Sequence, residues 1–181
     1  MKIRQTIFLL PLFLLAGCAS AGGSQSRDLD SKELCTEEQV FQYADFEWGT
    51  DSEQLFKQSS LKFDKKDLGQ GDESSTKTYE SKEKFSLENA ESNMDLEFSD
   101  GQLSQVSFTF DIEQDANTWI QKEVDELNSL YGGGIATGLG NQIYQWQGEQ
   151  DTVLQLTAFT EGDESATVIL SVASMEYSIG S

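Results

Sequence analysis

The sequence predicts an α+β fold: an antiparallel sheet with helices on one face, in the order helix, three strands, helix, three strands. Segments in which apolar and polar residues alternate follow one another across short turns, as in strands joined by hairpins. A long segment with apolar residues at helical spacing separates two such groups, and a short capped helix precedes the first. Helices placed between groups of hairpin-linked strands are typical of the α+β class, and the two similar halves indicate a weak tandem repeat.

Residues 1–17 have the organisation of a secretory signal. A short cationic start is followed by an apolar run over residues 7–15 and then by the small residues Ala16 and Gly17. The run is too short for a transmembrane helix, which needs about 20 apolar residues. We therefore predict that residues 1–17 are a signal peptide that is removed.

The end of this signal, Leu15-Ala16-Gly17-Cys18, resembles the lipobox of bacterial lipoproteins at all four positions. The resemblance implies cleavage before Cys18, a diacylglycerol group on its sulfur and an acylated new amino terminus. Two or more acyl chains anchor a protein stably, because each buried CH₂ contributes about 0.8 kcal/mol. In the same families Ala19 after the lipidated cysteine favours the outer membrane, with the protein facing the periplasm. The alternative is an ordinary secreted protein with Cys18 near the cut by chance.

The remaining chain divides into a tether and one domain. Residues 18–35 are predicted to form the lipidated cysteine and a flexible tether, because small polar residues dominate its start. Residues 36–181 are predicted to form a single α+β domain. Once Cys18 is lipidated, Cys35 is the only thiol, so an internal disulfide is excluded; burial, pairing with another chain and reactivity stay open for it.

Two capping-box spacings mark helix starts in the first part of the domain. The first predicts a short helix over residues 37–43, a segment that would also suit a strand. The second, with Thr50 as N-cap and Glu53 three residues later, predicts a helix that ends near Ser60. The charged, Gly- and Ser-rich residues 64–76 are predicted to form a loop.

A strand over residues 77–87 precedes the strongest hairpin signal, in which two alternating segments flank Asp100-Gly101. A two-residue turn would place Val106 on the opposite face from the other large apolar residues. A three-residue loop with Gly101 in the left-handed conformation keeps them together, so we predict pairs of Phe98 with Gln102 and of Met94 with Val106. The polar alternates of this second strand, Gln105, Ser107 and Thr109, indicate that the other sheet face meets solvent.

The second half begins with the clearest helix, predicted over residues 115–131. Its apolar stripe is Ile120, Val124, Leu127 and Tyr131, its start is capped by Asp115 or Asn117, and Gly132 follows its end. A glycine-rich loop over residues 132–140 and three alternating segments follow, at 143–146, 154–158 and 168–172.

The motif Phe46-x-Trp48-Gly49-Thr50-x-x-Glu53-x-Leu55 resembles the opening of small envelope proteins built from repeated helix-plus-sheet units. These include the β-lactamase-inhibitor-protein-like fold and the SmpA/OmlA group of outer-membrane assembly lipoproteins. The resemblance implies a fold of this kind and supplies no site residues.

The composition excludes several kinds of catalysis. The sequence contains no histidine, so Ser-His-Asp and Cys-His mechanisms and histidine-containing zinc sites are excluded. The carboxylates of Asp111, Glu113 and Asp115 do not continue as a calcium loop, because Ala116 and Lys122 stand where a glycine and a glutamate are needed. The acidic segment 161–164 is interpreted as a solvated hairpin tip, with calcium binding as the alternative. We therefore predict no enzymatic activity, no cofactor and no metal site.

The leading functional hypothesis is a membrane-anchored envelope lipoprotein that acts as a protein-binding or assembly-accessory module. Its partners would be membrane lipid, through Cys18, and an envelope protein; the formal net charge of −20 disfavours nucleic acid. Trp48, Trp119 and Trp146 are candidates for a recognition patch, with core packing as the alternative. Two other functions stay open: an inhibitor of a cationic enzyme such as a lysozyme or protease, and a carboxylate-based hydrolase.

Overall fold

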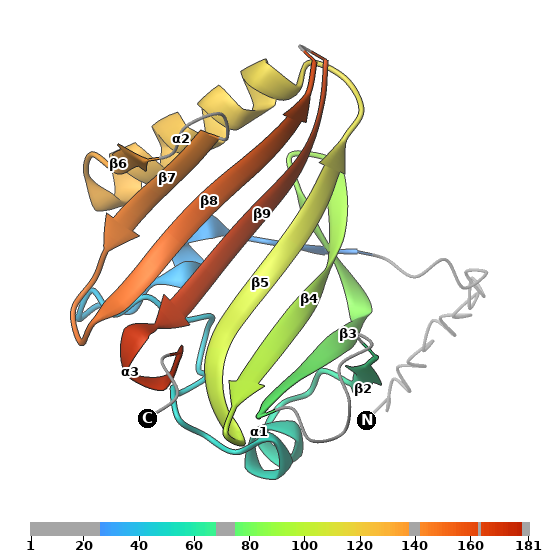
Figure 1. Ribbon diagram of the computed structural model, residues 1–181, viewed down its shortest axis with the longest axis vertical. Coiled ribbons are helices and arrows are strands. Elements are labelled where there is room, and N and C mark those ends of the chain that lie inside the picture. Colours follow the sequence, from blue (N-terminus) through green and yellow to red (C-terminus); the bar gives the residue numbers. More distant parts are fainter. Residues whose placement is uncertain (1–25, 68–74, 138–141, 163, 179–181) are drawn as a thin grey trace, which may run out of the picture.

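The computed structural model describes residues 26–67, 75–137, 142–162 and 164–178. The predicted signal peptide, Cys18 and part of the glycine-rich loop lie outside the described residues. Within them, nine strands form one sheet in the order β1-β3-β4-β5-β9-β8-β7-β6, and β2 also pairs with β3 (Figure 1). Its strands are β1 (Arg27–Asp28), β2 (Phe63–Lys66), β3 (Thr76–Leu87), β4 (Ala90–Ser99), β5 (Gln102–Ile112), β6 (Ile135–Thr137), β7 (Gln142–Gln147), β8 (Thr152–Glu161) and β9 (Ser165–Ser174).

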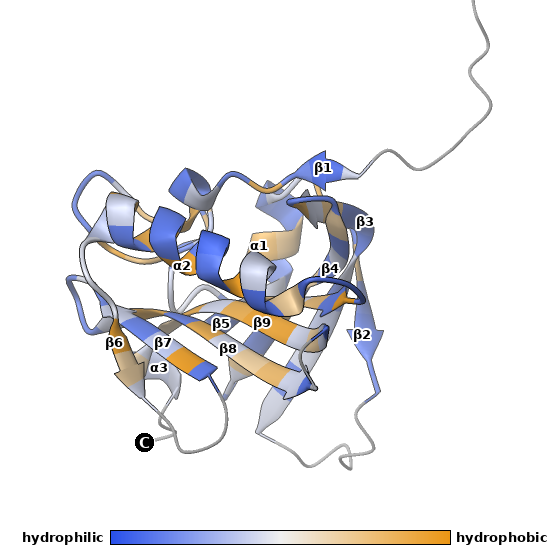
Figure 2. Cartoon of the chain, turned by 90° about the horizontal axis from the view of Figure 1, so that it is seen from above, coloured by the Kyte–Doolittle hydropathy of each residue, from blue (hydrophilic) through white to orange (hydrophobic). Residues whose placement is uncertain are grey.

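The helices of the described residues are a short 3-10 helix η1 (Ser31–Leu34), α1 (Ser52–Gln58), α2 (Ala116–Tyr131) and α3 (Met175–Ser178). Figure 2 shows α1 and α2 on the same side of the sheet, whose other face carries neither of them. The one-turn helix α3 packs at the ends of β5 and β9. The structure therefore combines one large sheet with few helices. This arrangement agrees with the predicted α+β class.

The predicted order of helix, three strands, helix, three strands is wrong, because four strands follow each of the two longer helices. The additional strands, β2 and β6, lie at the edges and are short. Strand β2 has the composition of a loop, because its residues are mostly charged. In the fold Lys66 bonds to Asp95 at 2.8 Å and to Glu80 at 3.1 Å, so the charges of this edge strand are paired across the sheet.

The predicted tether over residues 18–35 is too long, because the folded part begins by Arg27. Strand β1 pairs in parallel with the end of β3, the one parallel pairing among the described strands. Leu29 and Leu34 are buried in the core. Two leucines five residues apart have neither the helical nor the strand period, so a sequence pattern cannot distinguish this packed segment from a polar linker.

The helix predicted over residues 37–43 is absent from the structure. Cys35 and Phe41 form an isolated antiparallel bridge, and the hydroxyl of Thr36 accepts a hydrogen bond from the Val40 N–H at 3.2 Å. Gln39 closes this turn with a φ of 62°. The Thr36 side chain closes a tight turn here by accepting from the residue four positions on, whereas a helix N-cap accepts from the residue two or three positions on.

Helix α1 is confirmed, but its N-cap is Asp51, one residue beyond the predicted Thr50. The Asp51 carboxylate accepts a hydrogen bond from the Gln54 N–H at 2.9 Å. Thr50 instead accepts from the Leu103 N–H with its backbone carbonyl. The start of α1 is thereby fixed to β5, and tertiary pairing decides between two adjacent residues that are both good caps.

The β4–β5 hairpin exists, but the predicted three-residue loop is wrong. Asp100 and Gly101 form a two-residue turn with φ of 50° and 83°, and Phe98 pairs with Leu103 rather than Gln102. The register then shifts by one residue after Glu97, so that Leu96 pairs with Val106. A bulge, and not a longer loop, brings the large apolar residues onto one face.

Helix α2 covers the inner face of the sheet. Ile120, Val124 and Leu127 are buried as predicted, against inward residues of β5, β8 and β9 such as Phe110. The expected side-chain cap is not formed: Asp115 has a φ of 52° and no capping hydrogen bond. The N–H of Ala116 donates to the Glu164 carbonyl at 3.1 Å, so the β8–β9 hairpin anchors the start of the helix.

Candidate functional site

The face of the sheet turned away from α2 is the first candidate site. One row of outward residues crosses five strands in register: Asp95, Ser107, Ser171, Gln155 and Gln145. All five are partly exposed, although they lie at the centre of the sheet. The prediction that Gln105, Ser107 and Thr109 face solvent is confirmed for this side of β5, on which Thr109 is exposed.

A second row lies beside the first and contains Thr109, Ile169, Thr157 and Ile143. Together the two rows define what we call the open face. Short hydroxyl side chains and partly exposed isoleucines dominate it, and Phe159, 43% exposed, extends it at one end of β8. Such a surface is shallow, and its centre holds no charged residue.

Charge is confined to the margins of the open face. Asp95 and Glu97 lie on β4, Asp111 on β5 and Glu161 at the end of β8. Burial raises the pKa of the Glu97 carboxyl above its ordinary value. Burial alone would lower the pKa of Lys66, but its hydrogen bonds to Asp95 and Glu80 leave that pKa raised. The rim is therefore mainly acidic, with Lys66 held by two carboxylates.

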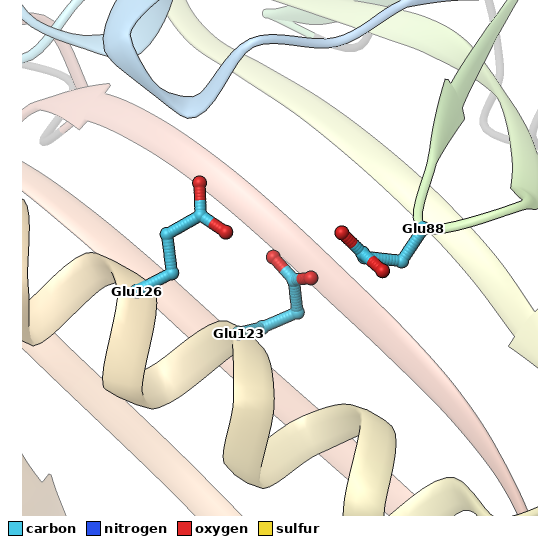
Figure 3. A group of neighbouring side chains, drawn as sticks. All are labelled: Glu88, Glu123 and Glu126. Carbon is cyan, nitrogen blue, oxygen red and sulfur yellow. The ribbon is translucent and has the colours of Figure 1, made fainter.

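The second candidate site is a group of three glutamates on the helical side. Glu88 lies in the β3–β4 turn, and Glu123 and Glu126 project from successive turns of α2 (Figure 3). Carboxylate oxygens of the three residues lie within 4.8 Å of one another. Lys122 forms an ion pair with Glu88. We call these three residues the glutamate cluster.

Glu123 is the unusual member of the glutamate cluster. It is 1% exposed, and neither of its carboxylate oxygens has a hydrogen-bond partner. Burial, and then the negative charges of Glu126 and Glu88, raise the pKa of Glu123 to about 7, against a smaller opposite effect of Lys122. The other two members are exposed, so one buried carboxylate sits between two that reach solvent.

A hollow adjoins the glutamate cluster between the β3–β4 turn and the N-terminal segment. Asp28, Asp30, Ser31, Glu88 and Glu126 line it, together with neighbouring backbone. Ser31 is 2% exposed and its hydroxyl has no hydrogen-bond partner. Glu123 does not line the hollow, so a substrate in it would meet the two outer carboxylates and not the buried one.

Glu123 was not predicted as a site residue, although the sequence contains a signal for it. Ile120, Glu123 and Leu127 fall at i, i+3 and i+7 of the helix, so a charged residue stands within the apolar stripe. An ionisable residue at a core position needs a partner or a role. Glu88 could not be found in this way, because its approach to α2 depends on how the hairpin packs.

The three tryptophans do not form a common patch. Trp146 is 3% exposed, and its indole N–H donates to Asn128 Oδ1 at 3.1 Å and to the Gly132 carbonyl at 3.0 Å. It fastens β7 to the end of α2, so a partner could reach it only by opening the core. For Trp146 the core alternative therefore fits, and a surface recognition role does not.

The other two tryptophans are partly exposed and pack against the core. The Trp48 indole donates to the Phe41 carbonyl at 2.9 Å, whereas the Trp119 indole nitrogen is buried without a partner. Trp119 lies beside Phe110, with ring centroids 5.9 Å apart. Neither belongs to the open face, and a recognition role for these two stays a prediction.

Comparisons with known proteins add no relatives: no family, no curated protein and no solved structure matches the chain. The resemblance to lipoproteins and to helix-plus-sheet envelope modules therefore stays a prediction. Among the described residues, no helix is both long enough and apolar enough to span a bilayer.

Proposed function

We propose that this chain is a non-enzymatic envelope lipoprotein that binds another protein through the open face of its sheet. An acylated Cys18 would hold it on the outer membrane, facing the periplasm. The lipobox at residues 15–18 supports the anchor. The open face supports the binding role, because two partly exposed isoleucines, Ile169 and Ile143, and the exposed Phe159 lie on a side of the sheet that neither α1 nor α2 covers.

The charge distribution supports a partner of complementary charge. The centre of the open face is uncharged and its margins carry Asp95, Glu97, Asp111 and Glu161, within a chain of formal net charge −20. A complementary protein surface would place apolar side chains over Ile169 and Ile143 and lysines or arginines around them. Attraction between the two surfaces would speed their encounter and weaken with salt.

The same complementarity favours one alternative, an inhibitor of a cationic enzyme. A basic lysozyme is a suitable probe because it carries the opposite charge. If the alternative holds, the protein inhibits such a lysozyme at low salt, and replacing Ile169 by Asp removes the inhibition. Absence of inhibition at low ionic strength eliminates this alternative. It does not affect the proposal that the protein binds an envelope partner.

Site-specific photocrosslinking in living cells tests the main proposal. A photoreactive residue at Ser171, the centre of the open face, is expected to give one discrete crosslinked product in the envelope. The same residue at Gln121, exposed on α2, is the matched control and is expected to give none. Adding Ile169→Asp to the Ser171 probe should abolish the product, since a charge at this apolar site opposes docking.

Two results would reject the proposal. The first is equal crosslinking from Ser171 and Gln121, which indicates contact without a preferred face. The second is a product that persists with Ile169→Asp in a chain shown by circular dichroism to be folded. Circular dichroism of the variant is needed because a destabilised chain would lose crosslinks for another reason.

A further inference from the structure

The buried carboxylate of Glu123 lacks any partner within the described chain. An ionised carboxylate out of contact with water is costly unless a cation or hydrogen-bond donors compensate it. Neither oxygen of Glu123 accepts a hydrogen bond, and the nearby ammonium of Lys122 is engaged with Glu88. Packing alone therefore gives no reason for a glutamate at this core position of α2.

The surroundings of Glu123 increase the need for positive charge. Glu88 and Glu126 bring two more carboxylates to within 4.8 Å of it, and Lys122 supplies one positive charge. When all three carboxylates are ionised, they and the one ammonium leave two negative charges, the amount that a divalent cation neutralises. Figure 3 shows the carboxylate of Glu123 between those of Glu126 and Glu88.

We propose that Glu88, Glu123 and Glu126 bind one calcium ion. The donors are all carboxylate oxygens, which hard cations prefer. Calcium takes ligands at about 2.3–2.6 Å, so opposite ligands around it are about 5 Å apart, whereas magnesium brings them to about 4 Å. The oxygens of the glutamate cluster all lie within 4.8 Å of one another, a spacing that ligands of one calcium ion can have.

The elements that carry the ligands suit such a site. Glu123 and Glu126 are fixed by the regular helix α2, and Glu88 lies in a tight turn with Asn89, both at positive φ. The adjoining hollow, lined by Glu88 and Glu126, gives the ion and its water ligands a path from solvent. The ion would join a hairpin of the first half of the chain to the helix of the second. This inference does not depend on the proposed function.

The test uses the full-length protein in mild detergent, stripped with chelator and kept at constant ionic strength. Calorimetric titration with calcium chloride is expected to give one site per chain, with a Kd on the order of 10⁻⁴ M, because only three protein ligands are present. At calcium about 100-fold above Kd the Tm should rise by about 5–10 °C. Magnesium at the same concentration should give a distinctly smaller rise.

Two charge-removing variants make the test specific. Glu123→Gln keeps the shape of the side chain, so in chelator its Tm should equal or exceed that of the wild type, while calcium no longer raises it. Glu149→Gln removes the same charge from the exposed turn between β7 and β8 and should keep the full calcium response. This pattern separates loss of the site from loss of the fold.

Several outcomes overturn the assignment. Absence of a calcium response in the wild type rejects the site, and so does a full response in Glu123→Gln. An equal loss of response in Glu149→Gln would mean that calcium acts by general screening of an acidic chain. Equal binding of magnesium would reject calcium as the ion that the geometry selects.

Discussion

At the scale of single residues, the structure separates two tryptophans that sequence patterns treat alike. Trp146 is part of an alternating strand, and alternation gives no indication of which of its two faces is the inner one. The structure turns it inward, where it has two hydrogen-bond acceptors. Trp119 lies on α2 with its indole nitrogen buried and without a partner. The residues are the same, but their hydrogen-bonding environments are not.

This difference gives a testable stability prediction. Trp146→Phe leaves the Gly132 carbonyl without its donor and shortens the side chain in the core, so the free energy of unfolding should fall by about 2–4 kcal/mol. Trp119→Phe removes a donor that already lacks a partner, so it should cost clearly less. Urea unfolding of both variants measures the difference. Equal losses would contradict the hydrogen-bond account of Trp146.

Glu97 gives a prediction about pH. Burial raises the pKa of its carboxyl in the folded chain, and its cross-strand neighbours on the same face, Thr78 and Gln105, carry no charge. The folded state then binds the proton more tightly than the unfolded state does. Stability from this residue is complete at low pH and is lost as the pH rises from the ordinary value of 4.5 through the raised pKa.

The measurement is urea unfolding of the wild type and of Glu97→Gln at several values between about pH 4 and pH 7. Other carboxylates titrate in both proteins, so the difference between the two curves isolates Glu97. The stability of the wild type should fall relative to that of the variant as the pH rises. Parallel curves would show that burial does not perturb this carboxyl.

At the scale of elements, the periodicity of apolar residues predicted those helices and strands whose formation depends mainly on their own sequence. Helix α2 and the strands β3, β4 and β5 follow from periodicity, and Gly101 takes the left-handed conformation predicted for it. The bulge after Glu97 was not predictable, because a longer loop and a bulge both bring the apolar residues onto one face. The edge strands β2 and β6 were missed because their pairing, and not their own composition, makes them strands.

Gly49 tests how the segment before α1 is held. Its φ is 76°, and a Cβ at this position would lie 2.7 Å from the ring of Tyr177 in α3. Gly49→Ala should therefore lower the free energy of unfolding by about 1–3 kcal/mol, from backbone strain and displacement of the ring. Gly133, after α2, has open space around it and is the matched control.

Thermal or urea unfolding of the two glycine variants measures whether the loss of stability is specific to Gly49. Gly133→Ala should leave the stability within about 0.5 kcal/mol of the wild type, as for surface substitutions elsewhere. Comparable losses at both positions would contradict a specific role for the positive φ of Gly49 and its contact with Tyr177.

At the scale of the whole molecule, the sequence predicted the class of fold but not its extent. The described N-terminal residues belong to the domain, since β1 pairs with β3 and Leu34 is buried. The glutamate cluster joins Glu88 to α2 across more than thirty residues, as its ion pair with Lys122 illustrates. Contacts between residues so far apart in the sequence depend on how complete helices and strands pack, and no local sequence pattern predicts them.

The open face could be anticipated in part. Polar alternates on β5 indicated a solvent-facing side, which the structure confirms. Its apolar members come from strands that are distant from β5 in the chain: Ile169 lies on β9, which pairs with β5, and Ile143 lies on β7, beyond β9 and β8 in the sheet. Strand order therefore creates the surface, and strand order was the part of the fold that could not be inferred.

The central claim is that Cys18 carries lipid and holds the domain at a membrane. Metabolic labelling with a radioactive fatty acid, followed by membrane fractionation, tests it in one experiment. The wild type and Cys35→Ser, the matched control with the other thiol removed, should carry label and sediment with membranes. Cys18→Ser should carry no label and should not be processed at residue 18. Label and membrane association unchanged in Cys18→Ser would contradict the account.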